Sequence, residues 1–103
     1  MKLRFTPRAA RDLAGIADHV REHSPQAALR VRAAIFESLQ SLVLFPQIGR
    51  QQKVEGVRKL VTRRYPYLVY YTADDGAGEI VILAIQHPAM FSMVHHKLDH
   101  LQI

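Results

Sequence analysis

A hydroxyl residue followed by proline occurs twice near the start of the chain, at Thr6-Pro7 and at Ser24-Pro25. A Ser or Thr side chain can accept a hydrogen bond from a free amide of the first helical turn, and proline at the first helical position sacrifices no hydrogen bond. Each pair therefore predicts the start of a helix. We expect one helix over residues 7–23 and a second from residue 25 to the Phe45-Pro46 step, which together form a helical hairpin.

Apolar residues recur at helical spacing in both segments. The first helix carries one stripe, made of Leu13, Ile16, Ala17 and Val20. The second carries two stripes, one of Ala28, Val31, Ile35, Leu39 and Leu42, and another of Leu29, Phe36 and Val43. Two stripes offer more apolar surface than one neighbour covers. The second helix is expected either to pack on a sheet and on the first helix together, or to leave part of its surface for a partner.

Alternating apolar and polar residues predict four strands, over residues 2–5, 57–63, 67–73 and 79–87. The intervening residues 47–55 read as a loop, Pro66 marks a turn or sheet edge, and residues 74–78 read as a hairpin loop. The last strand is apolar on both faces, so it is expected to be central and covered on both sides. The order β-α-α-β-β-β predicts a single α+β domain over residues 1–103, with the helical hairpin packed on a small, mainly antiparallel sheet. The spacing of Phe91, Val94, Leu98 and Leu101 would also suit a short C-terminal helix.

Composition narrows the class of protein. The 103 residues carry a formal net charge of +5 and an apolar fraction of 49%, which suits a globular protein with an acidic partner or nucleic acid, or simply a basic surface. There is no cysteine, hence no disulfide framework, and the N-terminal segment lacks the apolar run of a signal peptide. No window has the length of a membrane span. We therefore expect a cytoplasmic protein that does not act in a membrane.

Residues 56–71 combine four Arg or Lys with all four tyrosines of the chain. Such a surface can hold an acidic partner, a phosphate backbone or a base. Tyr67 and Tyr71 are expected to share one face of their strand, and Leu68 and Tyr70 the other. Tyrosines in a short sheet more often pack than stack on bases, so two of the four are expected to be structural.

Several segments, taken in order, resemble the RelE/ParE toxin superfamily of type II toxin–antitoxin systems, and the ParE branch most. The segments are residues 5–20, the Phe45-Pro46-x-x-Gly49-Arg50 motif, residues 56–60, residues 65–71 and residues 85–87. The resemblance implies a toxin that acts by binding DNA gyrase, not as an enzyme, uses no cofactor, and is neutralised in a hetero-oligomer by the acidic C-terminal segment of an antitoxin. It implies as an alternative a RelE-like endoribonuclease that cleaves mRNA on the ribosome. Met90 stands where the resemblance leads us to expect an arginine, so a third reading is a diverged toxin that retains only antitoxin binding.

The candidate site residues follow from these readings. For binding the target or the antitoxin we expect Arg58, Arg63, Arg64, Tyr65, Leu29, Phe36 and Val43. No catalytic residue is expected; a nuclease would use Arg58, His87 and Tyr67, with His87 as the acid–base group. Each of these charged residues could instead have a purely structural role. Arg58 could form an ion pair with Glu55 or Glu79, and His87 could pack at the strand end. Arg63 and Arg64 could lie in a solvated turn.

A histidine cluster near the C-terminus raises the question of a metal. His96 and His100 are four residues apart, as two ligands on one helix face would be, and His95 lies beside them. No third ligand is implied by the spacing. We therefore expect a polar helix face here and no metal site.

Overall fold

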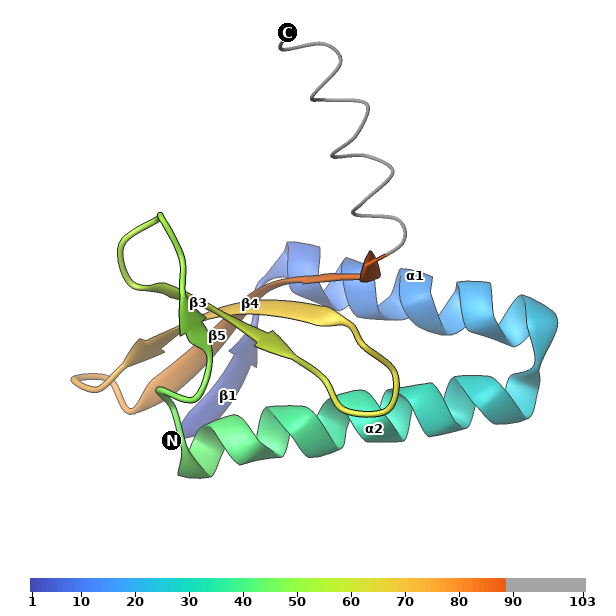
Figure 1. Cartoon of the computed structure of the whole chain (residues 1–103), viewed down its shortest axis with the longest axis horizontal. Helices are drawn as coiled ribbons and strands as arrows, with labels where there is room; N and C mark the ends of the chain where they lie inside the picture. The colour runs from blue at the N-terminus through green and yellow to red at the C-terminus, as the bar shows by residue number, and fades with distance from the viewer. Residues whose placement is uncertain (89–103) are drawn as a thin grey trace, which may run out of the picture.

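The computed structural model describes residues 1–88 and folds them into two helices and five strands. The elements in chain order are β1 (Lys2–Phe5), α1 (Pro7–His23), α2 (Pro25–Leu44), β2 (Arg50–Gln51), β3 (Val57–Val61), β4 (Leu68–Asp74) and β5 (Glu79–Gln86). The two helices form an antiparallel hairpin beside the sheet (Figure 1). The predicted C-terminal helix lies outside the described residues.

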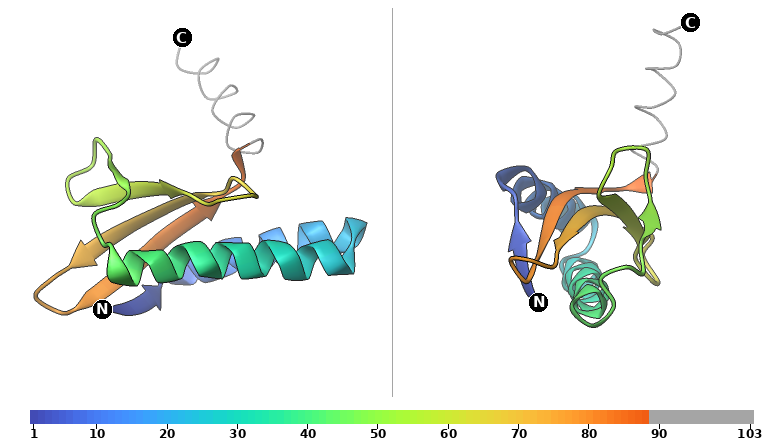
Figure 2. Two further views of the ribbon diagram at one scale, coloured as in Figure 1. Left: turned by 60° about the horizontal axis from the view of Figure 1, so that its bottom comes forward. Right: turned by 90° about the vertical axis from the view of Figure 1, so that its left-hand side faces the viewer.

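The strands form one sheet in the order β1-β5-β4-β3-β2. β1 runs parallel to β5, and the other three pairs are antiparallel. Both helices cover the same face of this sheet (Figure 2). The α+β class and the mainly antiparallel sheet predicted from the sequence are confirmed.

Both predicted helix starts are confirmed by their caps. The Thr6 hydroxyl accepts a hydrogen bond from the amide of Ala9 at 3.0 Å, and the Ser24 hydroxyl accepts one from the amide of Ala27 at 3.1 Å. Ser24 also ends α1, because its own amide donates to the carbonyl of Val20. One residue therefore closes the first helix and opens the second, which makes the connection between them very short.

The core lies between the helices and the covered face of the sheet. α2 contributes four residues of the first predicted stripe, and the sheet side contributes residues of β4 and β5 together with Tyr67, which precedes β4. The side chains with at most 5% exposure in this cluster include Val31, Ile35, Leu39, Leu42, Tyr67, Val69, Tyr71, Ile80, Ile82 and Ile85. Two of the four tyrosines, Tyr67 and Tyr71, are thus buried packing residues on one face, as predicted.

Strand β5 continues past the end of the short β1. Side chains at the start of α1 form hydrogen bonds with the backbone groups of β5 that β1 leaves unpaired. The Thr6 hydroxyl donates to the carbonyl of Leu83 at 2.9 Å, and a carboxylate oxygen of Asp12 accepts from the amide of Ile85 at 3.0 Å. Arg8 lies 3.8 Å from the same carboxylate. The edge of the sheet is therefore closed by side chains where no strand covers it.

Three sequence-based expectations about the strands were wrong. The predicted loop over residues 47–55 contains β2, which pairs with Lys59 and Arg58 of β3. The second predicted strand ends at Val61 and not at residue 63, because the buried Thr62 closes the turn to β4. Its amide donates to the carbonyl of Tyr67 at 3.0 Å, and its hydroxyl binds the carbonyl of Tyr65 and the amide of Tyr67. β4 accordingly begins at Leu68.

The expectation that the last strand is covered on both sides was also wrong. Ile80 and Ile82 are fully buried, whereas Val81 and Leu83 on the other face are only half-buried. The reason is that both helices pack on one face of the sheet. The pairing also shifts here, since Tyr71 pairs with Ile82 but Tyr70 pairs with Ala84, which leaves Leu83 opposite no residue of β4.

Candidate binding groove and anchored loop

A groove of about 520 Å³ lies between α1 and α2. Its lining is mostly apolar and includes Leu13, Ala14, Ala17, Ala28, Leu29 and Phe36. Leu29 is 69% exposed, although it belongs to a helix whose other stripe is buried. Of the three residues in the second predicted stripe, the structure brings Leu29 and Phe36 into this groove, whereas Val43 is half-buried farther along α2 and outside the lining.

Charged side chains border the apolar groove. The guanidinium carbon of Arg32 lies 5.6 Å from the centre of the Phe36 ring, at the distance of a cation–π contact. Arg21 and Asp18 form an ion pair of 2.8 Å on the α1 side. The groove therefore combines an apolar floor with a rim that carries guanidinium groups.

The loop after α2 is held by a buried tyrosine. The Tyr71 hydroxyl donates to the carbonyl of Pro46 at 2.8 Å and accepts from the amide of Gly49 at 2.8 Å. A Cβ atom at residue 49 would lie 2.6 Å from the Tyr71 ring, so only glycine fits against it. The pKa of Tyr71 is raised, chiefly by burial, against the lowering effects of the Gly49 amide and of Arg58. The Pro46-x-x-Gly49 part of the motif is thus explained by packing.

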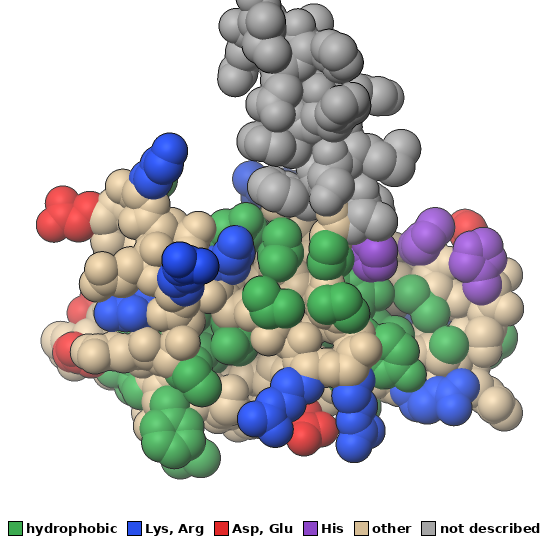
Figure 3. All heavy atoms as spheres, viewed as in Figure 1, with side chains coloured by type: hydrophobic (Ala, Val, Ile, Leu, Met, Phe, Trp, Pro, Cys, Tyr) green, Lys and Arg blue, Asp and Glu red, His purple; other side chains and the backbone are tan. Residues whose placement is uncertain are grey.

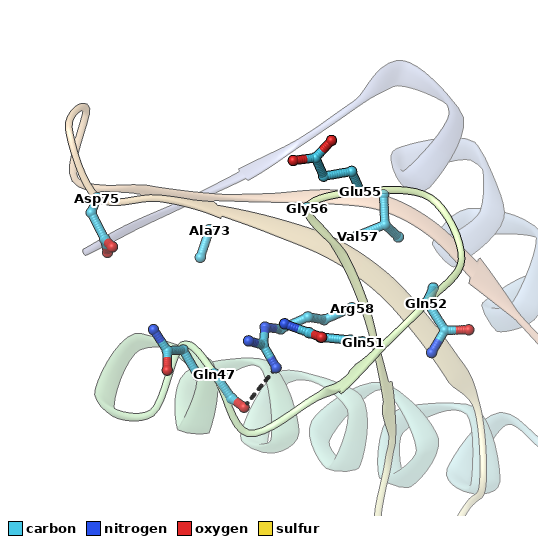
Figure 4. Close-up of a pocket in the computed structure, with 9 residues that line it drawn as sticks. All are labelled: Gln47, Gln51, Gln52, Glu55, Gly56, Val57, Arg58, Ala73 and Asp75. Carbon is cyan, nitrogen blue, oxygen red and sulfur yellow. Dashed lines mark hydrogen bonds between the residues drawn. The ribbon is translucent and has the colours of Figure 1, made fainter.

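Arg58 holds the same loop from β3. Its Nη1 donates to the carbonyl of Gly49 at 2.8 Å and to that of Gln47 at 3.2 Å. Figure 4 shows its side chain pointing from β3 toward the loop, where it lines a polar cavity of about 290 Å³. The alternative role for Arg58, an ion pair with Glu55 or Glu79, is not observed: Glu79 lies 3.3 Å from Arg4, and no ion pair of Arg58 occurs among residues 1–88.

Of the three residues that a nuclease would use, the structure brings Tyr67 and His87 together and leaves Arg58 apart. Arg58 pairs across the sheet with Tyr71, which is four residues from Tyr67, or about 13 Å along an extended strand. At that far end the rings of Tyr67 and His87 meet edge to face, with centroids 5.2 Å apart. Tyr67 is buried, and burial followed by the proximity of Tyr65 raises its pKa. Tyr67 and His87 therefore form a packing contact beside the ends of β4 and β5.

The turn between β3 and β4 displays the remaining predicted cations. Arg63 and Arg64 are exposed and Tyr65 is half-buried. Arg64 has a φ of 68°, in the left-handed region that few non-glycine residues adopt. The amide of Tyr65 donates to the carbonyl of Arg63 at 2.7 Å. Elsewhere on this side of the molecule, Lys and Arg side chains gather over the β2–β3 end of the sheet (Figure 3).

A second exposed apolar surface, which the sequence analysis missed, lies where α2 ends. Leu44, Phe45 and Ile48 are 74%, 61% and 55% exposed and line a shallow depression of about 570 Å³. The sequence did carry a signal, since three large apolar residues flank the proline that ends the helix.

Two further expectations concern metals and membranes. The predicted cluster of His95, His96 and His100 lies outside the described residues. Among residues 1–88, no group of three or more His, Cys, Asp or Glu is placed to hold a metal ion. Within the same range, neither helix is both long and apolar enough to cross a membrane.

Comparison with known proteins identifies the family to which this fold belongs. The family model of the ParE toxin of the type II toxin–antitoxin system parDE matches residues 3–90. Toxin RelE2 of Caulobacter vibrioides is 36% identical over 86 residues, which cover 82% of this chain and 92% of that protein. The chromosomal ParDE system of P. aeruginosa contains a chain of the same fold, with a TM-score of 0.72 and 36% identity over 84% of this chain and 95% of that one. The RelBE2 toxin–antitoxin complex of Mycobacterium tuberculosis matches with a TM-score of 0.61 and 29% identity, over 84% and 95% of the two chains.

Two helices on one face of a five-stranded mixed sheet are therefore the architecture of a type II toxin of the RelE/ParE superfamily. Within that superfamily, the chain belongs to the ParE toxin family. The resemblance stated from the sequence is confirmed. Because the matched structures include toxin–antitoxin complexes, the family membership implies an antitoxin as partner.

Proposed function

We propose that this toxin inhibits DNA gyrase by binding it, and that its antitoxin neutralises it by inserting an apolar segment into the groove between α1 and α2. The observation that carries the antitoxin part is the groove itself, with Leu29 at 69% exposure above an apolar floor. An exposed leucine that continues into an apolar groove forms a contiguous apolar surface, and such surfaces mark docking sites. The gyrase part rests on membership of the ParE family.

The charge of the molecule supports an acidic antitoxin segment. The chain has a formal net charge of +5, and Arg32 lies at the groove where its side chain covers Phe36. An amphipathic segment could bury apolar residues on Leu29 and Phe36 while its carboxylates meet the guanidinium groups at the rim. Leu29, Phe36, Arg58, Arg63, Arg64, Tyr65 and Val43 stay predictions as binding residues, and the groove favours the first two.

The antitoxin proposal is tested with two matched substitutions on α2. Leu29→Glu places a charge in the groove, whereas Leu44→Glu changes an equally exposed leucine, at 74%, outside it. In calorimetric titrations with the antitoxin encoded beside this gene, we expect the first change to weaken binding by about tenfold or more. The second should leave the affinity unchanged. Equal affinities for both variants would remove the groove from the interface.

The gyrase proposal is tested in a supercoiling reaction with purified enzyme. We expect inhibition by the free toxin and relief of that inhibition by the antitoxin, with no effect on translation. The separation of Arg58 from Tyr67 and His87 supports binding over RNA cleavage. Cleavage of mRNA on ribosomes that is lost in His87→Ala would replace this proposal by the nuclease reading. Normal antitoxin binding without either activity would identify a diverged toxin.

A further inference from the structure

Two histidines lie one turn apart at the end of α1. His19 and His23 are both exposed, and their rings meet edge to face with centroids 5.3 Å apart and an interplanar angle of 71°. Residues four apart share one face of a helix. Histidine side chains gather over the α1 end of the molecule on the side shown in Figure 3. Neither histidine lines the groove between the helices.

Two imidazoles in this arrangement can chelate one ion. The neutral imidazole nitrogen is a good ligand for copper, nickel and zinc, and it binds at about 2.0–2.1 Å. Rotation of the two exposed side chains can turn one nitrogen of each ring toward a shared point between the turns. We propose that His19 and His23 form a site for a divalent transition-metal ion, with two protein nitrogens and water in the remaining positions. By the general order of affinities, Cu(II) should bind most tightly.

The surrounding charges favour a cation here. Arg21 lies two residues from each histidine, which puts it on the opposite side of the helix, and it is held by Asp18 at 2.8 Å. Glu22 is exposed and lies beside His23, three residues after His19. The pair stands in the last turns of α1, where the partial negative charge of the helix end attracts cations.

The site is separate from the proposed binding groove. Ala17, Asp18 and Arg21 line the groove, and they face away from His19 and His23. Metal binding should therefore persist when the antitoxin is bound. The inference does not depend on the proposed function, because the antitoxin could bind elsewhere without changing the histidine pair.

The experiment is a Cu(II) titration of the 103-residue chain, monitored by calorimetry and by electron paramagnetic resonance. His95→Asn, His96→Asn and His100→Asn are introduced first, since these residues offer a second source of imidazole. In that background we expect His19→Gln and His23→Gln each to weaken Cu(II) binding by about tenfold or more. The spectrum should change from two coordinated nitrogens to one.

A matched control keeps the number of histidines but breaks the spacing. His23→Gln combined with Arg21→His places two imidazoles two residues apart, on opposite sides of α1. This variant should bind Cu(II) as weakly as His23→Gln alone. If it binds as tightly as the background chain, or if the background chain binds no more tightly than the single variants, the two histidines do not form a chelating site. Far-ultraviolet circular dichroism of each variant verifies that α1 remains folded.

Discussion

Replacing Arg58 with methionine tests whether this side chain serves the fold. Methionine retains an unbranched apolar stem but removes the guanidinium, and so both bonds to the loop, at 2.8 Å to the carbonyl of Gly49 and at 3.2 Å to that of Gln47. A hydrogen bond from a charged donor contributes about 1.5–3 kcal/mol. The bond to Gly49 is partly buried and counts nearly in full, whereas the bond to Gln47 is long and exposed and adds little. We expect the free energy of unfolding to fall by about 2 kcal/mol and the melting temperature by roughly 10 °C.

The measurement is urea denaturation followed by circular dichroism, with the slope of the transition compared between variants. An unchanged slope attributes a lower midpoint to stability and not to a more compact unfolded state. Lys59→Met is the matched control, because Lys59 is the next residue of β3, points to the opposite face, and should change stability by less than about 0.5 kcal/mol. If Arg58→Met is as stable as Lys59→Met but no longer inhibits gyrase, the reasoning fails and Arg58 belongs to the target interface.

Three other predictions follow from the described contacts. Gly49→Ala should lower the melting temperature, because its Cβ would lie 2.6 Å from the Tyr71 ring and overpacking of this kind costs about 1–3 kcal/mol; an unchanged melting curve would contradict the packing argument. Asp12→Ala should speed hydrogen exchange at the Ile85 amide, which loses its acceptor at 3.0 Å, and protection equal to the parent's would show that another group closes this edge. Stability should fall at alkaline pH, because the pKa values of Tyr67 and Tyr71 are raised above 10.0 in the folded chain. The native state then binds more protons than the unfolded state above that pH, so the stabilisation is complete below pH 10.0 and is lost as the pH rises through the raised values. In an ultraviolet titration Tyr67 and Tyr71 should ionise above pH 10.0, and ionisation of both below that pH would count against their burial.

The helices and most strands could be predicted because their signals are local. The Thr6-Pro7 and Ser24-Pro25 pairs state where each helix begins, and the hydroxyls do cap those helices. Strand β2 could not be predicted, since two residues show no periodicity and Arg50 and Gln51 are a strand only through their pairing with β3. The end of β3 depends on where the Thr62 hydroxyl finds its partners, three and five residues later. These boundaries are set by contacts and not by residue type.

Part of the candidate site could also be predicted, namely the part whose signal is local in the sequence. The heptad spacing of Leu29 and Phe36 placed both on one helix face, and a face that the sheet does not cover becomes a groove with α1. The partners of Arg58 left no pattern, because they are backbone carbonyls nine and eleven residues earlier. Every residue has a backbone carbonyl, so the residue types in the sequence do not indicate which carbonyls accept hydrogen bonds from Arg58.

The cations and tyrosines of residues 56–71 therefore divide by the face of the sheet on which they lie. Tyr71 and Arg58 meet across β3 and β4 on the covered face, and both bind the loop that follows α2. These hydrogen bonds of Tyr71 and Arg58, here called the brace, fix where α2 ends relative to the sheet. They therefore also fix the position of the exposed Phe45 and Ile48. The groove around Leu29 lies toward the other end of the same helix. A substitution in the brace should thus disturb the apolar surface at the end of α2 while leaving the groove intact, which separates structural effects of Arg58 from effects on antitoxin binding.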